Sequence, residues 1–134
     1  MKITDPVRVL IADDQPVLRL GLYSVLTRQP DLQPVGEAVS DREVLEQCRR
    51  LKPDVIVIDG SLSLPALIPR LQKRSSSCKV VVLVQVVEPE AVYYLINLGV
   101  DGIVSLADPS ESVVEAIRTV AKGSKYFSEL VLDQ

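Results

Sequence analysis

The segment Asp54-Val55-Ile56-Val57-Ile58-Asp59-Gly60 indicates how this chain folds. Its run of consecutive β-branched residues between polar ones is typical of a strand buried on both faces, as in a parallel sheet. The strand runs directly into Asp59, which places this carboxylate at the carboxyl end of a central strand. In open α/β sheets, ligands bind in the crevice outside those strand ends. Asp59 is therefore the first candidate functional residue.

The rest of the chain alternates between strand patterns and helix patterns. Further strands are predicted at residues 7–12, about 33–38, 79–84 and 102–105. Helices are predicted to start at Pro16, at a capping box formed by Ser40 and Glu43, near Ile68, at Glu88 and at Asp108. Five strands alternating with five helices predict an α/β fold with a parallel sheet and right-handed crossovers.

Some local features of these helices are also predicted. Pro65 and Pro69 lie four residues apart, so the third helix is expected to start only near Ile68 or to follow a distorted turn. Asp108 is expected to be the N-cap of the last helix. The inward faces expected for the first and fourth helices comprise Val17, Leu18, Gly21, Leu22, Val25 and Leu26, and Ala91, Val92, Leu95 and Ile96.

Length and composition restrict the class of protein. A chain of 134 residues with 47% hydrophobic residues is long enough for one domain with an aliphatic core. Its net charge of -3 gives no basic surface for nucleic acid or anionic lipid. No apolar run approaches the roughly 20 residues of a membrane span, and the N-terminus lacks a signal peptide's apolar stretch, so a cytoplasmic protein without a membrane partner is expected. Histidine is absent, and Cys48 and Cys78 lack metal-site or redox spacing, so both are expected to be reduced core residues.

Acidic residues follow two of the predicted strands. Asp13 and Asp14 end the first strand, and Asp59 ends the third. If these strands are neighbours, three carboxylates meet at one edge of the sheet. Such a group of like charges favours a bound cation, and ligands that are all oxygen atoms suit Mg²⁺. The alternative is that Asp13 and Asp14 only cap the first helix and that Asp59 only caps a turn.

Three sequence patterns together resemble a known family. They are Val9-Leu10-Ile11-Ala12-Asp13-Asp14-Gln15-Pro16, Val55-Ile56-Val57-Ile58-Asp59 and Gly99-Val100-Asp101-Gly102. The chain is similar over residues 7 to about 130 to the receiver domain of bacterial response regulators, most closely the LuxR/NarL type. The resemblance implies a flavodoxin-like (CheY-like) doubly wound sheet of strand order 2-1-3-4-5. Residues 1–122 would form the receiver domain, and residues 123–134 would begin a linker toward a DNA-binding domain that this sequence does not include.

The resemblance also implies functional roles. Asp59 would accept a phosphoryl group from a sensor histidine kinase. Asp13, Asp14, Asp59 and the backbone carbonyl of Ser61 would hold Mg²⁺. The protein would be a cytoplasmic regulator of transcription in a two-component system and not an enzyme. It is expected to form a homodimer and to reach DNA only through the further domain.

The chain departs from the family at the positions that respond to phosphorylation. Val84 stands where the family has Thr or Ser, Ile103 where it has an aromatic residue, and Leu106 where it has Lys. A shift in alignment brings in Gln85 or Ser105, but neither replaces the cation. Ser63 replaces the usual Pro, and the segment between Asp59 and the fourth strand is shorter than usual in the family.

These substitutions lead to several hypotheses. An aspartyl phosphate adds roughly two negative charges, and without the hydroxyl and the ammonium little draws the fourth and fifth strands toward it. Weak or absent switching is therefore expected. The alternatives are a fully responsive receiver with a different switch, and a stand-alone interaction module that dimerises through its last two helices and fifth strand. Haloacid-dehalogenase chemistry is disfavoured by Ser61, which stands where that class needs an acid, and a flavodoxin by the lack of a hydroxyl-rich phosphate loop and of aromatic flanks.

Overall fold

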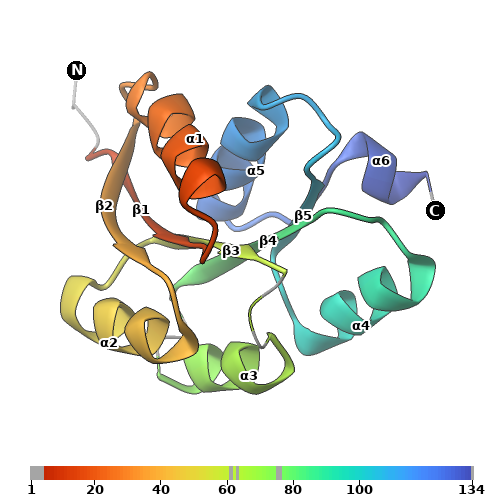
Figure 1. Ribbon diagram of the computed structural model, residues 1–134, viewed down its shortest axis with the longest axis horizontal. Helices are drawn as coiled ribbons and strands as arrows, with labels where there is room; N and C mark the ends of the chain where they lie inside the picture. The colour runs from red at the N-terminus through yellow and green to blue at the C-terminus, as the bar shows by residue number, and fades with distance from the viewer. Residues whose placement is uncertain (1–4, 61, 63, 75–76, 134) are drawn as a thin grey trace.

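One parallel sheet forms the centre of the molecule. The computed structural model describes residues 5–60, 62, 64–74 and 77–133. Its sheet has the order β2-β1-β3-β4-β5-β6, with every pair of neighbours parallel. The predicted order 2-1-3-4-5 is confirmed, with one short strand added at the β5 edge (Figure 1). The strands are β1 (Val7–Ala12), β2 (Leu32–Ala38), β3 (Val55–Asp59), β4 (Lys79–Val84), β5 (Gly102–Ser105) and β6 (Tyr126–Phe127).

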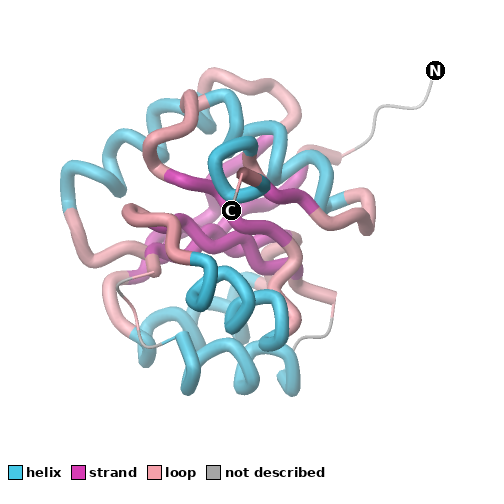
Figure 2. Tube along the Cα trace, turned by 90° about the vertical axis from the view of Figure 1, so that its right-hand side faces the viewer, coloured by secondary structure: helices cyan, strands magenta, loops and turns pink. Residues whose placement is uncertain are grey.

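Helices cover both faces of this sheet. The helices are α1 (Pro16–Thr27), α2 (Asp41–Leu51), α3 (Leu64–Arg74), α4 (Pro89–Leu98), α5 (Glu111–Ala121) and α6 (Glu129–Leu132). Helices α1 and α5 lie on one face, and α2, α3 and α4 lie on the other (Figures 1 and 2). None of the helices in the described part of the chain combines the length and the apolar character that a membrane span requires.

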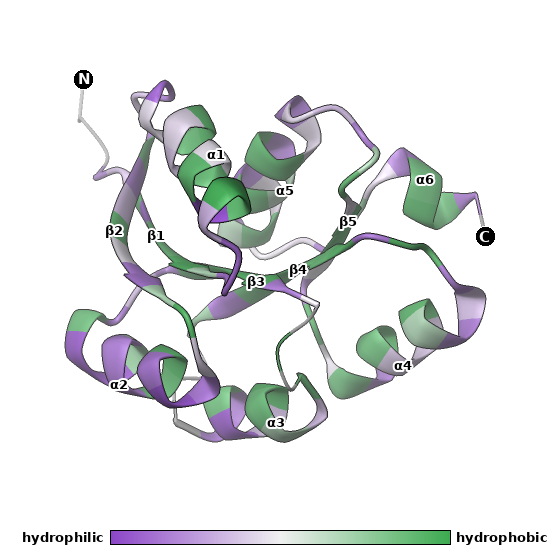
Figure 3. Ribbon diagram, viewed as in Figure 1, coloured by the Kyte–Doolittle hydropathy of each residue, from purple (hydrophilic) through white to green (hydrophobic). Residues whose placement is uncertain are grey.

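The core is divided by the sheet into two layers. In β3, Val55 and Val57 pack with α1 and α5, whereas Ile56 and Ile58 pack with α2, α3 and α4. Alternate residues of a strand point to opposite faces, so an unbroken run of β-branched residues supplies both layers. The hydropathy colouring in Figure 3 shows apolar residues along both the central strands and the helices, with α2 the most polar of the helices. This double burial holds β3 at the centre of the sheet and fixes the position of its carboxyl end.

The third helix begins earlier than expected. It runs from Leu64 to Arg74 and includes Pro69, so the prediction of a start near Ile68 is wrong. The alternative, a distorted turn before the helix, involves residues 61 and 63, which lie outside the described residues. Pro65 lies in the first turn, where its missing N–H costs no hydrogen bond. Leu64, Leu67, Ile68 and Leu71 are all buried on one side of the helix. Their burial favours a continuous helix despite the hydrogen bond that Pro69 cannot donate.

The buried stripes of α1 and α4 are narrower than predicted. Val17 is 84% exposed and Ile96 is 43% exposed, and Gly21 and Ala91 also face solvent. Each helix buries only side chains about one turn apart, Leu22 and Leu26 in α1 and Val92 and Leu95 in α4. Only the residues of each helix that face the sheet are buried, which leaves the adjoining apolar positions in water.

The last main helix does not begin at the predicted cap. It starts at Glu111 after Ser110, and no side chain caps it, so the prediction of Asp108 as N-cap is wrong. The N–H groups of Ser112 and Val113 instead donate to the carbonyls of Pro109 and Ser110, at 2.9 and 3.1 Å. A tight turn of this kind satisfies the first donors of a helix without a side-chain acceptor.

The end of the chain packs on the sheet. Tyr126 and Phe127 pair with Gly102 and Ile103 of β5, and Val131 of α6 is buried. The N–H of Ser105 also donates to the hydroxyl oxygen of Ser128, at 3.0 Å. Residues 123–133 are therefore joined to the sheet. It remains a prediction that they lead into a linker.

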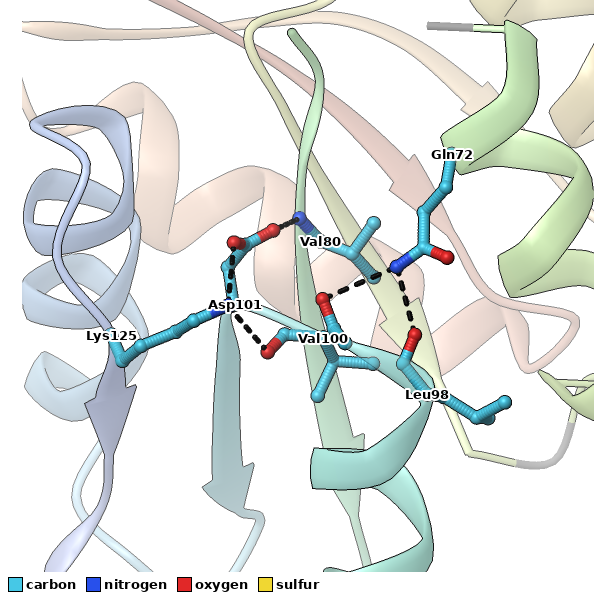
Figure 4. Close-up of polar contacts among 7 residues, drawn as sticks. Gln72, Val80, Leu98, Val100, Asp101 and Lys125 are labelled. Carbon is cyan, nitrogen blue, oxygen red and sulfur yellow. Dashed lines mark hydrogen bonds and ion pairs between the residues drawn. The ribbon is translucent and has the colours of Figure 1, made fainter. Parts of the chain in front are cut away.

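A polar network closes the amino-terminal edge of the sheet (Figure 4). Oδ2 of Asp101 accepts a hydrogen bond from the N–H of Val80 at 2.9 Å, and Oδ1 pairs with Nζ of Lys125 at 3.1 Å. Nε2 of Gln72 donates to the carbonyl of Leu98 at 2.8 Å, which ties α3 to the end of α4. Every charged group in this network has a partner, so the network serves stability.

Candidate functional site

The sheet register brings the predicted acidic residues together. β1 and β3 are neighbours, and Ala12 pairs with Ile58, so Asp13 and Asp59 leave the two strands side by side. One carboxylate oxygen from each of Asp13, Asp14 and Asp59 lies within 4.8 Å of the others. Ser61, whose carbonyl was predicted as a further ligand, lies outside the described residues. The predicted meeting of the three carboxylates is confirmed.

Asp13 and Asp59 are buried, whereas Asp14 is exposed. The backbone N–H of Gln15 donates to Oδ1 of Asp13 at 2.7 Å, and the Gln15 side-chain Nε2 donates to Oδ2 of Asp59 at 3.2 Å. Oδ2 of Asp13 is also buried but has no hydrogen-bond partner. An unpartnered buried carboxylate oxygen is costly, and a bound cation is the usual remedy.

The electrostatics of the site lead to the same conclusion. Burial raises the pKa of Asp13 to about 6, and the nearby charges of Asp59 and Asp14 add to the rise against the lowering effect of the Gln15 N–H. A divalent cation would remove this conflict, and the all-oxygen donor set suits Mg²⁺. The residues present therefore fit a magnesium ion.

Gln15 and Arg19 are parts of the site that the sequence analysis did not assign. Gln15 contacts two of the acidic residues through its backbone and its side chain. Arg19 donates from Nη1 to the backbone carbonyl of Asp13 at 2.9 Å and pairs through Nε with Glu37 at 3.1 Å. The only sequence signal for Gln15 was its place directly after the acidic pair. Arg19 lies one turn further along α1 and gave no signal.

The predicted switch positions surround the same strand ends. Val84 ends β4 and is half-buried, Ile103 is fully buried in β5, and Leu106 directly follows β5. The N–H of Leu106 donates to the carbonyl of Val84 at 2.9 Å, so these positions are adjacent. The hydroxyl of Ser105 accepts a hydrogen bond from the N–H of Ala107 at 3.1 Å. Val84 and Leu106 thus line the strand ends with aliphatic side chains, whereas Ile103 lies within β5 in the core.

A cleft of about 440 Å³ opens beside Asp59. We call it the Asp59 cleft. It is bounded by the end of β3, the start of α3, the segment after β4 and the helix α4. Its lining residues are Asp59, Gly60, Leu62, Leu64, Pro65, Val84, Gln85, Val86, Ala91, Tyr94 and Leu95. Asp59 therefore has the acidic cluster on one side and a largely apolar hollow on the other.

The cysteines lie away from this chemistry. Cys48 and Cys78 are free and buried. Burial raises the pKa of both thiols to about 12. Thiols that stay protonated are poor nucleophiles and poor metal ligands, which agrees with their predicted place in the core.

Comparison with known families now identifies the domain. Residues 9–121 match the model of the response regulator receiver domain. The chain belongs to the response regulator receiver domain family. A receiver domain is a regulatory module and not an enzyme, so the predictions of family and of enzyme status are confirmed, and the haloacid-dehalogenase and flavodoxin interpretations are set aside. The acidic pocket of Asp13, Asp14 and Asp59 is typical of the Mg²⁺ site of receivers.

Several relatives are similar to this receiver domain. The response regulator VraR of Staphylococcus saprophyticus is 31% identical over 130 residues, which cover 95% of this chain and 62% of the relative. The receiver domain of the putative response regulator NarL of Mycobacterium tuberculosis has a TM-score of 0.83 at 25% identity, covering 90% of this chain and 99% of that one. RcsB of Salmonella enterica serovar Typhimurium, bound to a promoter with a phosphomimetic, has a TM-score of 0.87 at 23% identity, covering 96% and 66%.

These matches relate the receiver to regulators of the LuxR/NarL type. The likeness to RcsB, at its low identity, shows a shared fold. This receiver spans about three fifths of the length of the VraR relatives.

Proposed function

We propose that this receiver is the signal-receiving domain of a transcriptional response regulator, and that phosphorylation at Asp59 switches it weakly or not at all. One observation carries the proposal. The acidic cluster of Asp13, Asp14 and Asp59 is complete, whereas Val84 and Leu106 bring neither a hydroxyl nor an ammonium group to the adjoining strand ends.

The chemistry of phosphoryl transfer needs a positioned carboxylate. An oxygen of Asp59 attacks the phosphorus of a kinase phosphohistidine, an O–P bond forms, the N–P bond breaks, and the imidazole leaves with the electron pair and takes up a proton. Gln15 holds Oδ2 of Asp59 through its amide at 3.2 Å and so restricts the rotation of the carboxylate. A bound Mg²⁺, held by Asp13, Asp14, Asp59 and the carbonyl of Ser61, would neutralise charge on the transferring group.

The proposal of weak switching follows from the charges and contacts around Asp59. A phosphoryl group shifts a conformational equilibrium only if its contacts differ between the two states. The side chain of Val84 offers no hydrogen bond and that of Leu106 no positive charge, so movement of β4 or β5 toward the phosphate would gain little. Ile103 is buried with the core on the α3 and α4 side, where rotation would cost apolar contact.

Labelling by a small phosphodonor tests the acceptor and the switch separately. We expect Mg²⁺-dependent incorporation from phosphoramidate into the wild type and none into Asp59→Asn, measured by intact-mass spectrometry. Light scattering before and after labelling should show less than about a threefold change in the self-association constant, that is, less than 1 kcal/mol of coupling. A matched double variant, Val84→Thr with Leu106→Lys, should gain phosphorylation-dependent association.

Two results would overturn parts of the proposal. If the wild type incorporates no phosphoryl group while Mg²⁺ still binds, Asp59 is not the acceptor. If labelling tightens wild-type self-association many-fold, the alternative of a fully responsive receiver with a different switch is correct.

The partners are also proposed. We infer a cytoplasmic protein that receives its phosphoryl group from a sensor histidine kinase. We also infer that it contacts DNA only through a C-terminal domain that this sequence does not include, because the VraR relatives are longer than this receiver. RcsB has been seen as dimers bound to DNA, which supports a homodimer here.

A stand-alone interaction module is the second candidate. The exposed Tyr93 and Ile96 on α4 favour it, since neither side chain contributes to the core. It predicts self-association that is unchanged in Asp59→Asn, which light scattering would measure.

A further inference from the structure

Charged residues are distributed unevenly over the helices of this receiver. Helices α4 and α6 contain glutamate but no lysine or arginine, whereas α3 contains lysine and arginine but no acidic residue. Helix α2 lies near the β2 edge of the sheet, and α6 lies near the β5 edge (Figure 1). The net charge of -3 is a sum over the whole chain and does not show this separation.

Three arginines line one hollow on the outside of α2 and α3, which we call the α2–α3 face. Arg42 and Arg49 of α2 and Arg70 of α3 border this hollow of about 660 Å³, and its other charged residues are Asp41 and Glu46. Within the described part of the chain, none of the three guanidinium groups has a hydrogen bond or an ion pair. Arg42 also lies in the first turn of α2, where a cation is unfavourable to the helix dipole. Helix stability therefore does not explain its place.

An apolar hollow of about 260 Å³, which we call the α4–α6 groove, lies toward the other edge of the sheet. Tyr93 and Ile96 of α4, Phe127 of β6 and Leu132 of α6 line it. Tyr93 is 70% exposed and Leu132 is 67% exposed. Two large apolar side chains of the groove thus face water.

Acidic residues flank this groove. Glu88 and Glu90 adjoin Pro89, which lines the groove, and Asp133 follows Leu132. All three acidic residues are exposed. A guanidinium group is attracted to the face of a tyrosine ring, and the arginine stem packs on apolar surface. The groove therefore has the chemistry to bind an arginine side chain.

We propose that the α2–α3 face of one copy of this receiver binds the α4–α6 groove of a second copy, with an arginine over the ring of Tyr93. The two surfaces lie on different sides of the molecule (Figure 1), so they meet between copies. Two α4–α6 grooves facing each other would bring carboxylates together, and two α2–α3 faces would bring guanidinium groups together. Like charges placed opposite each other are costly, so unlike surfaces fit better than like ones.

A contact between unlike surfaces leaves one of each kind open on every pair of copies. Such a contact extends into chains unless its rotation closes a ring. The inference goes beyond the proposed homodimer by naming both surfaces. It does not depend on phosphoryl transfer to Asp59, so it can hold or fail independently of that part of the proposed function.

Self-association of the unphosphorylated full chain tests the contact. In light scattering, the average mass should rise with protein concentration up to about 1 mM. Because charges are paired across the contact, raising NaCl from about 0.05 M to about 0.5 M should weaken association about tenfold.

Two variants, each damaged on one surface, test which surfaces meet. Arg49→Glu with Arg70→Glu reverses the α2–α3 face and leaves the groove intact, whereas Tyr93→Lys does the opposite. Each variant alone should associate more than about tenfold more weakly than the wild type. An equal mixture should form a one-to-one complex with the wild-type affinity and grow no further, because each variant supplies the surface that the other lacks.

Matched controls carry the same changes elsewhere. Arg28→Glu with Lys122→Glu reverses two exposed cations outside α2 and α3, and Tyr23→Lys replaces an exposed tyrosine on α1. Both controls should associate like the wild type. Urea titrations of all four variants confirm that each is folded.

Four results would overturn the proposal. The first is a wild type that stays monomeric up to about 1 mM. The second is a mixture of the two damaged variants that stays monomeric, which would indicate contact between like surfaces. The third is wild-type association in either damaged variant alone. The fourth is loss of association in the control that reverses Arg28 and Lys122, which would show a general effect of charge.

Discussion

The aspartates at the amino-terminal edge of the sheet have different surroundings from those at the carboxyl-terminal edge. At the amino-terminal edge, Asp101 receives the N–H of Val80 and the ammonium of Lys125, and Asp54 receives the N–H of Arg8 at 2.9 Å. At the carboxyl-terminal edge, Asp13 keeps a buried oxygen without a hydrogen-bond partner beside two further carboxylates. The first edge uses carboxylates to satisfy strand donors. The second concentrates negative charge, which destabilises the fold and is available to bind a cation.

The largest effect on stability is expected at the amino-terminal edge, which we call the stabilising edge. Asp101→Ala leaves the buried N–H of Val80 without its acceptor, so the free energy of unfolding should fall by about 2–3 kcal/mol in urea titrations. Lys125→Ala is the control, because its side chain is 56% exposed and its loss should cost under about 1 kcal/mol. If the two variants lose the same stability, the ion pair and not the strand cap matters at this edge.

At the carboxyl-terminal edge, where the acidic cluster lies, a substitution is expected to raise the free energy of unfolding. Asp13→Asn removes a buried charge and keeps an oxygen for the N–H of Gln15, so the free energy of unfolding in chelator at pH 7 should rise by about 2 kcal/mol. Added Mg²⁺ should stabilise the wild type more than the variant and narrow this gap. Asp54→Asn, at the other edge, is the matched control and should give no gain. Destabilisation by Asp13→Asn would contradict the assignment of the two edges.

The pH dependence of the free energy of unfolding should also reveal the buried charge of Asp13. The pKa of Asp13 is raised to about 6 from its ordinary value of 3.8, so between these values the folded state binds more protons than the unfolded state. Stability must then rise as the pH falls. From pH 7 to pH 5 in chelator the wild type should gain about 1 kcal/mol relative to Asp13→Asn. Parallel pH profiles for the two proteins would show that Asp13 does not titrate in this window.

The acidic edge could be predicted from the sequence because it depends on strand ends. Runs of β-branched residues marked β1 and β3, and the residues that follow such runs must lie at one edge of a parallel sheet. The partners of Asp101 could not be predicted, since they depend on the register that brings Val80 and Lys125 beside it. The Asp59 cleft was also missed, because it depends on how α4 is turned. The apolar pattern of α4 suggested Ala91 and Ile96 as inward residues when only a narrower stripe is buried.

The smallest effect is expected where a paired carboxylate is exposed. Arg118 bonds Asp31 at 2.7 Å and lowers its pKa, yet the side chains of Arg118 and Asp31 are 41% and 50% exposed. Asp31→Asn should therefore cost less than about 1 kcal/mol at pH 7. A lowered pKa gives stability that is present above the unfolded value and is lost as the pH falls through the folded value, so the stabilities of the wild type and the variant should converge in urea titrations as the pH is lowered past the ordinary Asp value of 3.8. Salt at 1 M should also reduce the difference by screening. If Asp31→Asn cost as much stability as Asp101→Ala, ion pairing alone would explain the stability that Asp101 provides. We expect instead that Asp101→Ala costs more, because it leaves the buried N–H of Val80 without an acceptor.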